Sequence, residues 1–497
     1  MPLESARTSL SFRQGNDKQL SLEQLPVLIL ETIFNLLQTP DLLVVCSISK
    51  DFYFAALNCV YRSICITDDS LTVQYYKKHT RRSNGYYCTI MPSRKIEALL
   101  EVVSNNRTIA AMIHRVKIIH TEQVSLIPRL LSYLRLKSFV YAGPLKIPPE
   151  STHDLHTLQL CLLSVYPCAR NLRELKVNHF NQDSDFEQYG RLALSLIELD
   201  SYRNIRKLAF EHLEDRSLNL LNTFNIERHT AIPRPSWVGF FEAFSKRGII
   251  LNLAALSLDG NVGNLGELAA QIIGLAVQLS ELQTLEARQT EHSHPGQAHS
   301  VGMMTFLDSI TKFTPLLQYL SMRHTDNCLT CQIKTITHIL RDNIPHQLKQ
   351  LVIKFEPRTI ADSDRIERLI LSYQRNLQKI DYEDRSSSIS DLTNLAKALD
   401  TQQQKKWLDD WYYGEKTREI FTPHILSIEG PRPYINDEKK EMIKICGKQI
   451  LSFLNSNTLY KGALKHLPFL TEYCVFGLHV NVKSCGVFAN GETILLE

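Results

Sequence analysis

The chain has 497 residues, of which 22% are charged, and a formal net charge of +4. Its length exceeds what one ordinary hydrophobic core encloses, which predicts two or more domains or one long repeat array. The balanced charge argues against nucleic acid or a membrane surface as partner, and no apolar run reaches the roughly 18 residues that span a bilayer. Eleven scattered cysteines predict reduced thiols, and the lack of a signal-peptide pattern predicts a cytoplasmic or nuclear protein.

The first predicted element is a helix over residues 25–37, with the sequence LPVLILETIFNLL. At about 100° per residue, its apolar side chains cover roughly two-thirds of the circumference. A helix of this kind is normally buried on more than one side. Either the rest of the chain supplies both walls, or another protein supplies one of them.

Two further short helices are predicted directly after the first. Asp41 is a candidate N-cap for a helix that runs to Val45, because its carboxylate can accept backbone N–H groups. Residues 50–59 carry Phe52 and Cys59 on one helical face. Three short helices in about 45 residues enclose little core, so apolar side chains remain for a partner.

Four ordered fragments in this region, LP…I…I, DLL, ISKDF and YRSI, resemble the F-box family. The matching positions are Leu25, Pro26, Ile29, Ile33, Asp41, Leu42, Ser49, Lys50, Phe52, Tyr61 and Arg62. The family has an acidic residue where this chain has Leu28.

The resemblance implies a three-helix F-box that binds the Skp adaptor of a cullin–RING (SCF) ubiquitin ligase. The implied adaptor contacts are Leu25, Pro26, Ile29, Leu30, Ile33, Leu42 and Phe52. In the alternative interpretation, these helices only cap the domain that follows.

An apolar template, L-x-x-L-x-L with other apolar residues substituted, recurs along the rest of the chain. It begins at Ile113, Leu136, Leu155, Leu172, Ile205, Leu253, Leu282, Leu317, Leu348, Leu377 and Leu470. Apolar residues two apart form one face of a short strand. Helical stretches such as residues 265–282 lie between the matches, and Asn261 falls at the asparagine position of a leucine-rich repeat.

The alternation predicts an α/β fold, an irregular leucine-rich-repeat solenoid with a curved parallel sheet. The spacing between matches varies more than the roughly 20–29 residues of regular repeats. An ordinary α/β domain is therefore the alternative. The combination resembles the fungal-type F-box/leucine-rich-repeat family.

Composition and the template set the expected boundaries along the chain. They are a disordered N-terminus (1–20), the F-box (21–65), a linker with the first helices (66–110), the repeat array (111–399), an insertion or capping segment (400–460), and a terminal repeat and cap (461–497).

Candidate chemistry is sparse. One loop contains three histidines without an acidic or cysteine partner at ligand spacing: His292, His294 and His299. The C-x-x-C at residues 328–331, near His324, lacks the second pair that a four-ligand zinc site needs. The glycines of residues 260–266 have the wrong spacing for a dinucleotide loop, and the segment has no P-loop lysine. We therefore predict no catalytic residue, cofactor or metal.

The seventh residue of each template match faces away from the template leucines. These residues are Asn178, Glu211, Asp259, Arg288, Arg323, Lys354 and Glu383. Arg288, Arg323 and Lys354 come from successive matches. One interpretation is a charged face screened by acids such as Glu286 or Glu356. The other is a basic stripe that binds an acidic or phosphorylated substrate segment.

The functional hypothesis is a non-catalytic substrate receptor, in which the F-box holds the adaptor and the repeats hold the protein to be ubiquitylated. A repeat scaffold without ubiquitin ligase activity is the first alternative. An enzyme whose site is assembled from residues distant in sequence is the second.

Overall fold

The computed structural model describes residues 22, 25–34, 37, 39–68, 89–119, 126–141, 171–179, 183–212, 236–259, 265–289, 302–324, 329–355, 360–384, 437–475, 478–489 and 492–496. The chain divides into two compact units, residues 1–146 and 147–497. The described residues form helices and fifteen strands, and most strand pairs are parallel. The expected α/β class is therefore confirmed.

The first unit begins with three short helices: α1 (Val27–Phe34), α2 (Thr39–Ile48) and α3 (Lys50–Tyr61). Ser49 is the N-cap of α3, and its hydroxyl accepts the backbone N–H of Phe52 at 3.3 Å. Asp41 is not the cap expected from the sequence, because α2 begins two residues before it. Asp41 lies instead in the first turn, where the helix dipole favours a carboxylate.

The rest of the first unit alternates strands and helices. Its elements are β1 (Ser63–Thr67), β2 (Thr89–Met91), a 3-10 turn (Ser93–Lys95), α5 (Ile96–Asn105), α6 (Arg107–Met112), β3 (Arg115–Ile119), α7 (Ile127–Ser132) and β4 (Ser138–Tyr141). The strands lie in the order β2-β1-β3-β4 and are parallel. The sequence did not predict β1, a strand buried along its whole length, as parallel strands covered on both faces are.

The second unit repeats a strand–helix pattern. Its strands are β5 (Glu174–His179), β6 (Lys207–His212), β7 (Ala255–Asp259), β8 (Thr284–Gln289), β9 (Tyr319–His324), β10 (Gln350–Phe355) and β11 (Lys379–Asp384). Its helices are α9 (Asp183–Glu198), α11 (Ser236–Lys246), α12 (Gly266–Ala276), α13 (Gly302–Thr311), α14 (Leu329–Thr337) and α15 (Ile360–Tyr373), with short turns at Ser201–Asn204 and Leu279–Glu281 and a π-helical turn at His338–Asn343.

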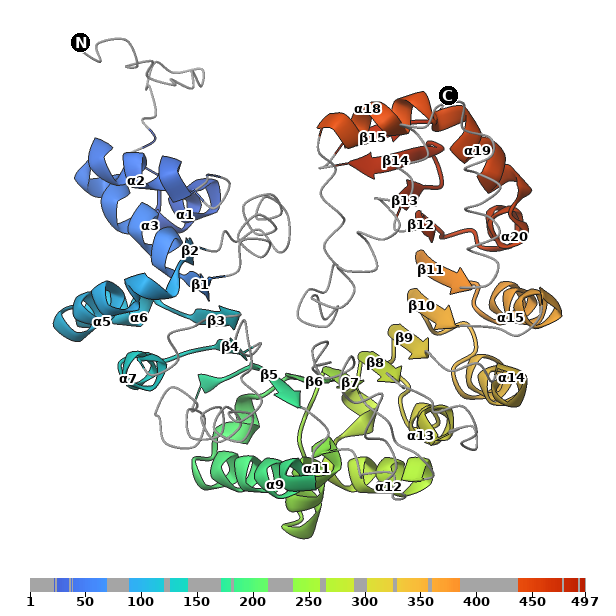
Figure 1. Cartoon of the computed structure of the whole chain (residues 1–497), viewed down its shortest axis with the longest axis horizontal. Coiled ribbons are helices and arrows are strands. Elements are labelled where there is room, and N and C mark those ends of the chain that lie inside the picture. The colour runs from blue at the N-terminus through green and yellow to red at the C-terminus, as the bar shows by residue number, and fades with distance from the viewer. Residues whose placement is uncertain are drawn as a thin grey trace, which may run out of the picture. The chain divides into compact units, whose positions relative to one another are not determined.

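The C-terminal part of this unit contains α18 (Asp437–Ile445), α19 (Gly447–Ser456), α20 (Thr458–His466), β12 (Glu472–Val475), β13 (Leu478–Asn481), β14 (Gly486–Ala489) and β15 (Glu492–Leu495). The strands pair in chain order, parallel from β5 to β12 and antiparallel from β12 to β15. Figure 1 shows α9 to α15 on one side of the curved sheet of this unit.

The apolar template locates the strands. Ten of its eleven matches lie two residues before the first residue of a strand, and the eleventh, at Leu155, lies outside the described residues. In the match at β8, the template residues Leu282, Leu285 and Ala287 are buried. The predicted parallel sheet is therefore confirmed. Asn261 lies outside the described residues.

The helix expected over residues 265–282 ends earlier, at Ala276. Val277 instead forms an isolated parallel bridge with Leu251. The carbonyl of Leu251 accepts the next backbone N–H, from Gln278, at 2.8 Å. These bonds provide partners for backbone N–H and C=O groups that would otherwise lack hydrogen bonds at the helix end.

The core of the second unit lies between its sheet and its helices. Phe210 of β6 packs edge-on against Phe240 and Phe241 of α11, with ring centroids 5.2 and 5.8 Å apart. Trp237 of α11 contacts Phe306 of α13. Each such ring pair contributes about 0.5–1.5 kcal/mol beyond its buried area. Aromatic packing thus joins successive helices to the sheet.

The expected insertion at residues 400–460 is described only from residue 437, where α18 and α19 form. Throughout the described ranges, no helix has the length and apolar composition that crossing a bilayer would require.

Candidate functional site

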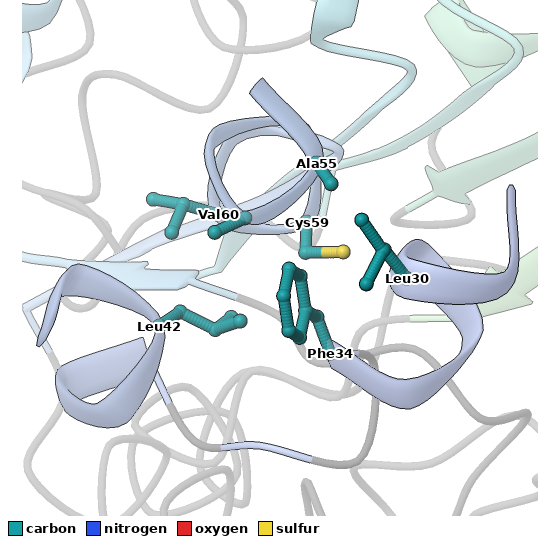
Figure 2. Close-up of a cluster of buried hydrophobic side chains, with 7 residues drawn as sticks. Leu30, Phe34, Leu42, Ala55, Cys59 and Val60 are labelled. Carbon is teal, nitrogen blue, oxygen red and sulfur yellow. The ribbon is translucent and has the colours of Figure 1, made fainter. Parts of the chain in front are cut away.

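The three helices α1–α3 form a module with its own small core. Phe34 lies at its centre, between Leu30 of α1, Leu42 of α2 and Cys59 of α3 (Figure 2). Burial and, second, the charge of Glu31 raise the pKa of the Cys59 thiol to about 12. The sulfur therefore stays protonated and packs as an apolar group.

A polar contact fixes α1 against α3 beside this core. The Asn58 amide nitrogen donates to Glu31 Oε1 at 2.7 Å, and Arg62 Nη1 lies 3.8 Å from Glu31 Oε2. The half-buried Glu31 carboxylate, held by Asn58 and Arg62, fixes the orientation of the two short helices. The module is thus closed on its inner side by apolar packing and by a charge-assisted hydrogen bond.

The outer side of the same module carries large apolar side chains that are exposed in the structure. They are Val27, Leu28, Ile29, Leu43, Val44, Ile48, Tyr53 and Phe54. Leu28, Val44 and Phe54, one from each helix, are 76%, 62% and 60% exposed. Burying such a side chain fully is worth about 1.5–3 kcal/mol. Apolar surface of this extent is typical of a protein-binding site.

The structure divides the seven predicted adaptor contacts. Leu30 and Leu42 are 1% and 0% exposed, so they hold the module together and do not face a partner, which corrects the expectation for both. Pro26 and Ile29 are exposed. Three others are partly buried and pack against the module core: Leu25, Ile33 and Phe52.

Sequence reasoning missed the most exposed large apolar residue of each helix: Leu28, Val44 and Phe54. The signal was present, because the sequence shows that the first helix is apolar almost all round. Which apolar side chains face the other helices is decided only by packing among the three helices.

A second candidate surface lies on the sheet of the second unit, on the side opposite to the template leucines. Its described charged side chains at the fifth and seventh template positions of β7–β11 are Asp259, Glu286, Arg288, Arg323, Lys354 and Asp381, and we call this set the charged face. Arg288 lies in register with Arg323, and Arg323 with Lys354. The three predicted cations therefore occupy adjacent strands, as expected.

Each of these cations has a carboxylate nearby. Arg288 Nη1 lies 3.9 Å from Asp259 Oδ2, and Arg323 Nε lies 3.8 Å from Glu286 Oε1. Lys354 Nζ lies 3.5 Å from Asp381 Oδ2. Three cations and three carboxylates balance within this set, and Lys379, which shares this face of β11, pairs with Glu472 of β12 at 2.8 Å.

Asp381 is the member of this set that sequence reasoning missed. Burial alone raises the pKa of Asp381, but the charges of Lys354 and Arg323 outweigh burial and hold that pKa below its ordinary value. Asp381 and Glu286 both occupy the fifth position of their template match, two residues before the seventh. Because side chains alternate along a strand, the fifth and seventh positions share one face.

Several predicted positions cannot be placed on this face. The side chains of Asn178, Glu211 and Glu383 lie outside the described part, as does the whole of Glu356.

The candidate metal ligands of the sequence also lie mostly outside the described residues: His292, His294, His299 and Cys328, and the side chains of His324 and Cys331. Where side chains are described, no three histidine, cysteine or acidic residues are placed to share a metal ion.

A buried cysteine, a partly exposed histidine and a buried glutamate meet on β12 and β13. Cys474 Sγ lies 3.9 Å from His479 Nε2, and His479 Nδ1 lies 2.5 Å from Glu472 Oε1. This order matches a nucleophile, a base and an orienting acid. Burial, however, raises the pKa of the Cys474 thiol well above its ordinary value. A buried, protonated thiol is unreactive, so this cluster supports packing and not catalysis.

No family model matches the sequence, and no curated protein matches it. Among solved structures, a crystal structure of a Bacteroides fragilis protein aligns with 52% of this chain and 72% of its own. The sequence identity is 13% and the TM-score 0.28. A match this distant carries no argument about function.

Proposed function

We propose that this chain is the substrate-recognition subunit of an SCF-type (Skp–cullin–F-box) ubiquitin ligase. In this proposal α1–α3 form an F-box that binds the Skp adaptor, and the second unit is an irregular leucine-rich-repeat solenoid that binds the target protein. The proposal rests on the exposed apolar side chains of the α1–α3 module, together with the ordered F-box-like fragments. Because the module core is already closed, burying these side chains against another protein would stabilise a complex.

The proposed role is not catalytic and needs no cofactor. Tethering a target beside a ubiquitin-charged conjugating enzyme raises the effective concentration of the target lysines. The subunit then contributes binding and orientation, and the chemistry belongs to other subunits. We propose that it acts in the cytoplasm, the nucleus or both.

The adaptor contact is tested with the double variant Ile29→Asp, Val44→Asp. Both side chains are exposed in the free module, so the variant is expected to fold, whereas a complex would bury two unpaired carboxylates. We expect adaptor binding to fall by at least about a hundredfold, since each buried charge costs several kcal/mol. The measurement is quantitative pull-down of recombinant Skp adaptor and cullin.

Leu275→Asp is the matched control, because Leu275 is 63% exposed on α12 of the second unit. It introduces the same chemistry outside the module and should leave adaptor binding unchanged. Undiminished pull-down by the double variant, or no adaptor binding by the unaltered chain, would remove the F-box assignment.

Affinity purification with the proteasome blocked separates the ligase from the scaffold alternative. The ligase role predicts adaptor, cullin and a ubiquitylated target in one preparation. A stable partner without cullin or ubiquitin would favour the leucine-rich-repeat scaffold without ligase activity.

A further inference from the structure

Strand β9 carries buried polar atoms without hydrogen-bond partners on its charged side. They are Nε and Nη2 of Arg323; beside them the buried hydroxyls of Tyr319 and Ser321 bond each other. The three residues are two apart, so they share one face of the strand. Buried polar atoms are nearly always hydrogen-bonded in folded proteins, and an exception often marks a water or ligand site. The two unbonded nitrogens of Arg323 therefore point to a missing acceptor.

The unbonded pair on Arg323 has a specific geometry. Nε and Nη2 form one edge of the planar guanidinium, and this edge presents two parallel N–H groups that match the two oxygens of a carboxylate. Arg323 itself is only 7% exposed. A buried fork of this kind is the arrangement that binds a carboxylate most strongly.

Glu286 balances the charge of Arg323 without filling the fork. Its Oε1 lies 3.8 Å from Arg323 Nε, which is too long for a hydrogen bond. Its Oε2 accepts the Ser257 hydroxyl at 3.3 Å. The internal carboxylate is therefore engaged elsewhere, and both N–H groups of the Arg323 edge remain available.

The neighbouring strands favour a singly charged ligand. Arg288 and Lys354 lie in register with Arg323 on the two neighbouring strands. Neighbouring strands are about 4.8 Å apart, so both positive charges attract an anion at Arg323. The charged face as a whole is already balanced by its three carboxylates. A doubly charged phosphate would leave more uncompensated charge among buried groups than a carboxylate would.

We propose that the charged face at β9 is a binding site for a carboxylate, supplied by an Asp or Glu side chain of an extended partner segment. Arg323 Nε–H and Nη2–H donate to its two oxygens, and the Ser321 and Tyr319 hydroxyls bond the same group or its flanking peptide. For the partner carboxylate to reach Arg323, the long Arg288 and Lys354 side chains must move aside. This inference deepens the proposed function by naming a chemistry for the target, and it rests on target binding by the second unit.

The test uses the full chain and a fluorescein-labelled oligoglutamate peptide, followed by fluorescence anisotropy. Arg323→Lys keeps the charge but removes the fork, so we expect affinity to fall at least about tenfold. The matched control, Arg203→Lys, makes the same exchange at an exposed cation outside the charged face and should change affinity by less than about threefold. Glu286→Gln should raise affinity, because it removes a competing carboxylate.

Three results would overturn the proposal: no oligoglutamate binding by the unaltered chain, equal binding by Arg323→Lys, or equal binding of an oligoglutamine peptide. Tighter binding of a phosphoserine peptide than of oligoglutamate would overturn the choice of carboxylate. Adaptor pull-down by Arg323→Lys is measured in parallel. If the unaltered chain binds the adaptor but not oligoglutamate, this inference has failed and the adaptor proposal stands; if it binds oligoglutamate but not the adaptor, the reverse holds. Circular dichroism verifies that each variant is folded.

Discussion

At the scale of single residues, Glu472 shows how the C-terminal strands hold buried charge. His479 Nδ1 and Lys379 Nζ lie 2.5 and 2.8 Å from the same oxygen, Glu472 Oε1. Burial alone raises the pKa of Glu472, but the His479 hydrogen bond and the cationic neighbours outweigh it. The pKa of this carboxyl is therefore held well below its ordinary value.

This shift predicts an acid-labile contribution to stability. A carboxyl whose folded-state pKa is depressed stabilises the fold above its unfolded-state pKa, and this contribution disappears as pH falls through the folded-state value. We expect the unaltered chain to lose more free energy of unfolding than Glu472→Gln when pH falls from about 7 to about 3, because the variant lacks the titrating group. Urea unfolding at both pH values measures the difference.

Glu441→Gln is the control, since Glu441 is largely exposed and pairs with Lys444, three residues away on α18. It should lower stability by less than about 1 kcal/mol at either pH. Parallel loss of stability in Glu472→Gln and the unaltered chain would contradict the assignment.

At the scale of elements, side-chain amides join successive strand–helix repeats. The amide nitrogen of Gln374, which follows α15, donates to the carbonyls of Leu340 and Ile344 at 2.8 and 2.9 Å. Gln347 bonds two carbonyls of the segment after α13 in the same way. These amides satisfy backbone oxygens that irregular connections between repeats would leave buried and unbonded.

Gln374→Met tests this role, because methionine has a similar volume but cannot donate. We expect a loss of about 1–3 kcal/mol in the free energy of unfolding, since two buried carbonyls lose their partner. Gln378→Met is the matched control at an exposed position of the next segment. Urea unfolding compares the two variants, and similar midpoints would show that the bonds of Gln374 contribute little.

At the scale of the whole molecule, the two units have separate cores. Phe34 and its neighbours close the helical module of the first unit, whereas the Phe210 cluster packs the sheet and helices of the second. Effects of substitutions in separate cores and without shared contacts usually add. The two proposed binding functions should therefore be separable.

We expect each binding function to be lost separately from the other. The Ile29→Asp, Val44→Asp chain should lose the adaptor and bind oligoglutamate normally, and Arg323→Lys should do the reverse. Combining all three substitutions should give binding free-energy changes that add within about 0.5 kcal/mol. Pull-down and anisotropy on the same preparations measure both functions. Loss of both by either variant would show that the units do not act independently.

The sequence by itself determined where most of the strands begin. Apolar residues at the first, fourth and sixth template positions must face one core, and this requirement fixes strand and face together. It therefore located ten strands and the row of Arg288, Arg323 and Lys354. No template match precedes the antiparallel strands β13–β15, so this pattern could not locate them.

Tertiary structure alone decided which residues these surfaces offer to a partner. Leu28 and Leu30 are both apolar members of α1, yet only packing against α2 and α3 leaves the first exposed and the second buried. In the sequence, Arg323 has no identifiable counterion, because Glu286 lies 37 residues away along the chain. In the fold, Glu286 on β8 lies beside Arg323 on the neighbouring strand β9. Local patterns encode the periodicity of one element, whereas burial and charge pairing depend on neighbours that only the folded chain brings together.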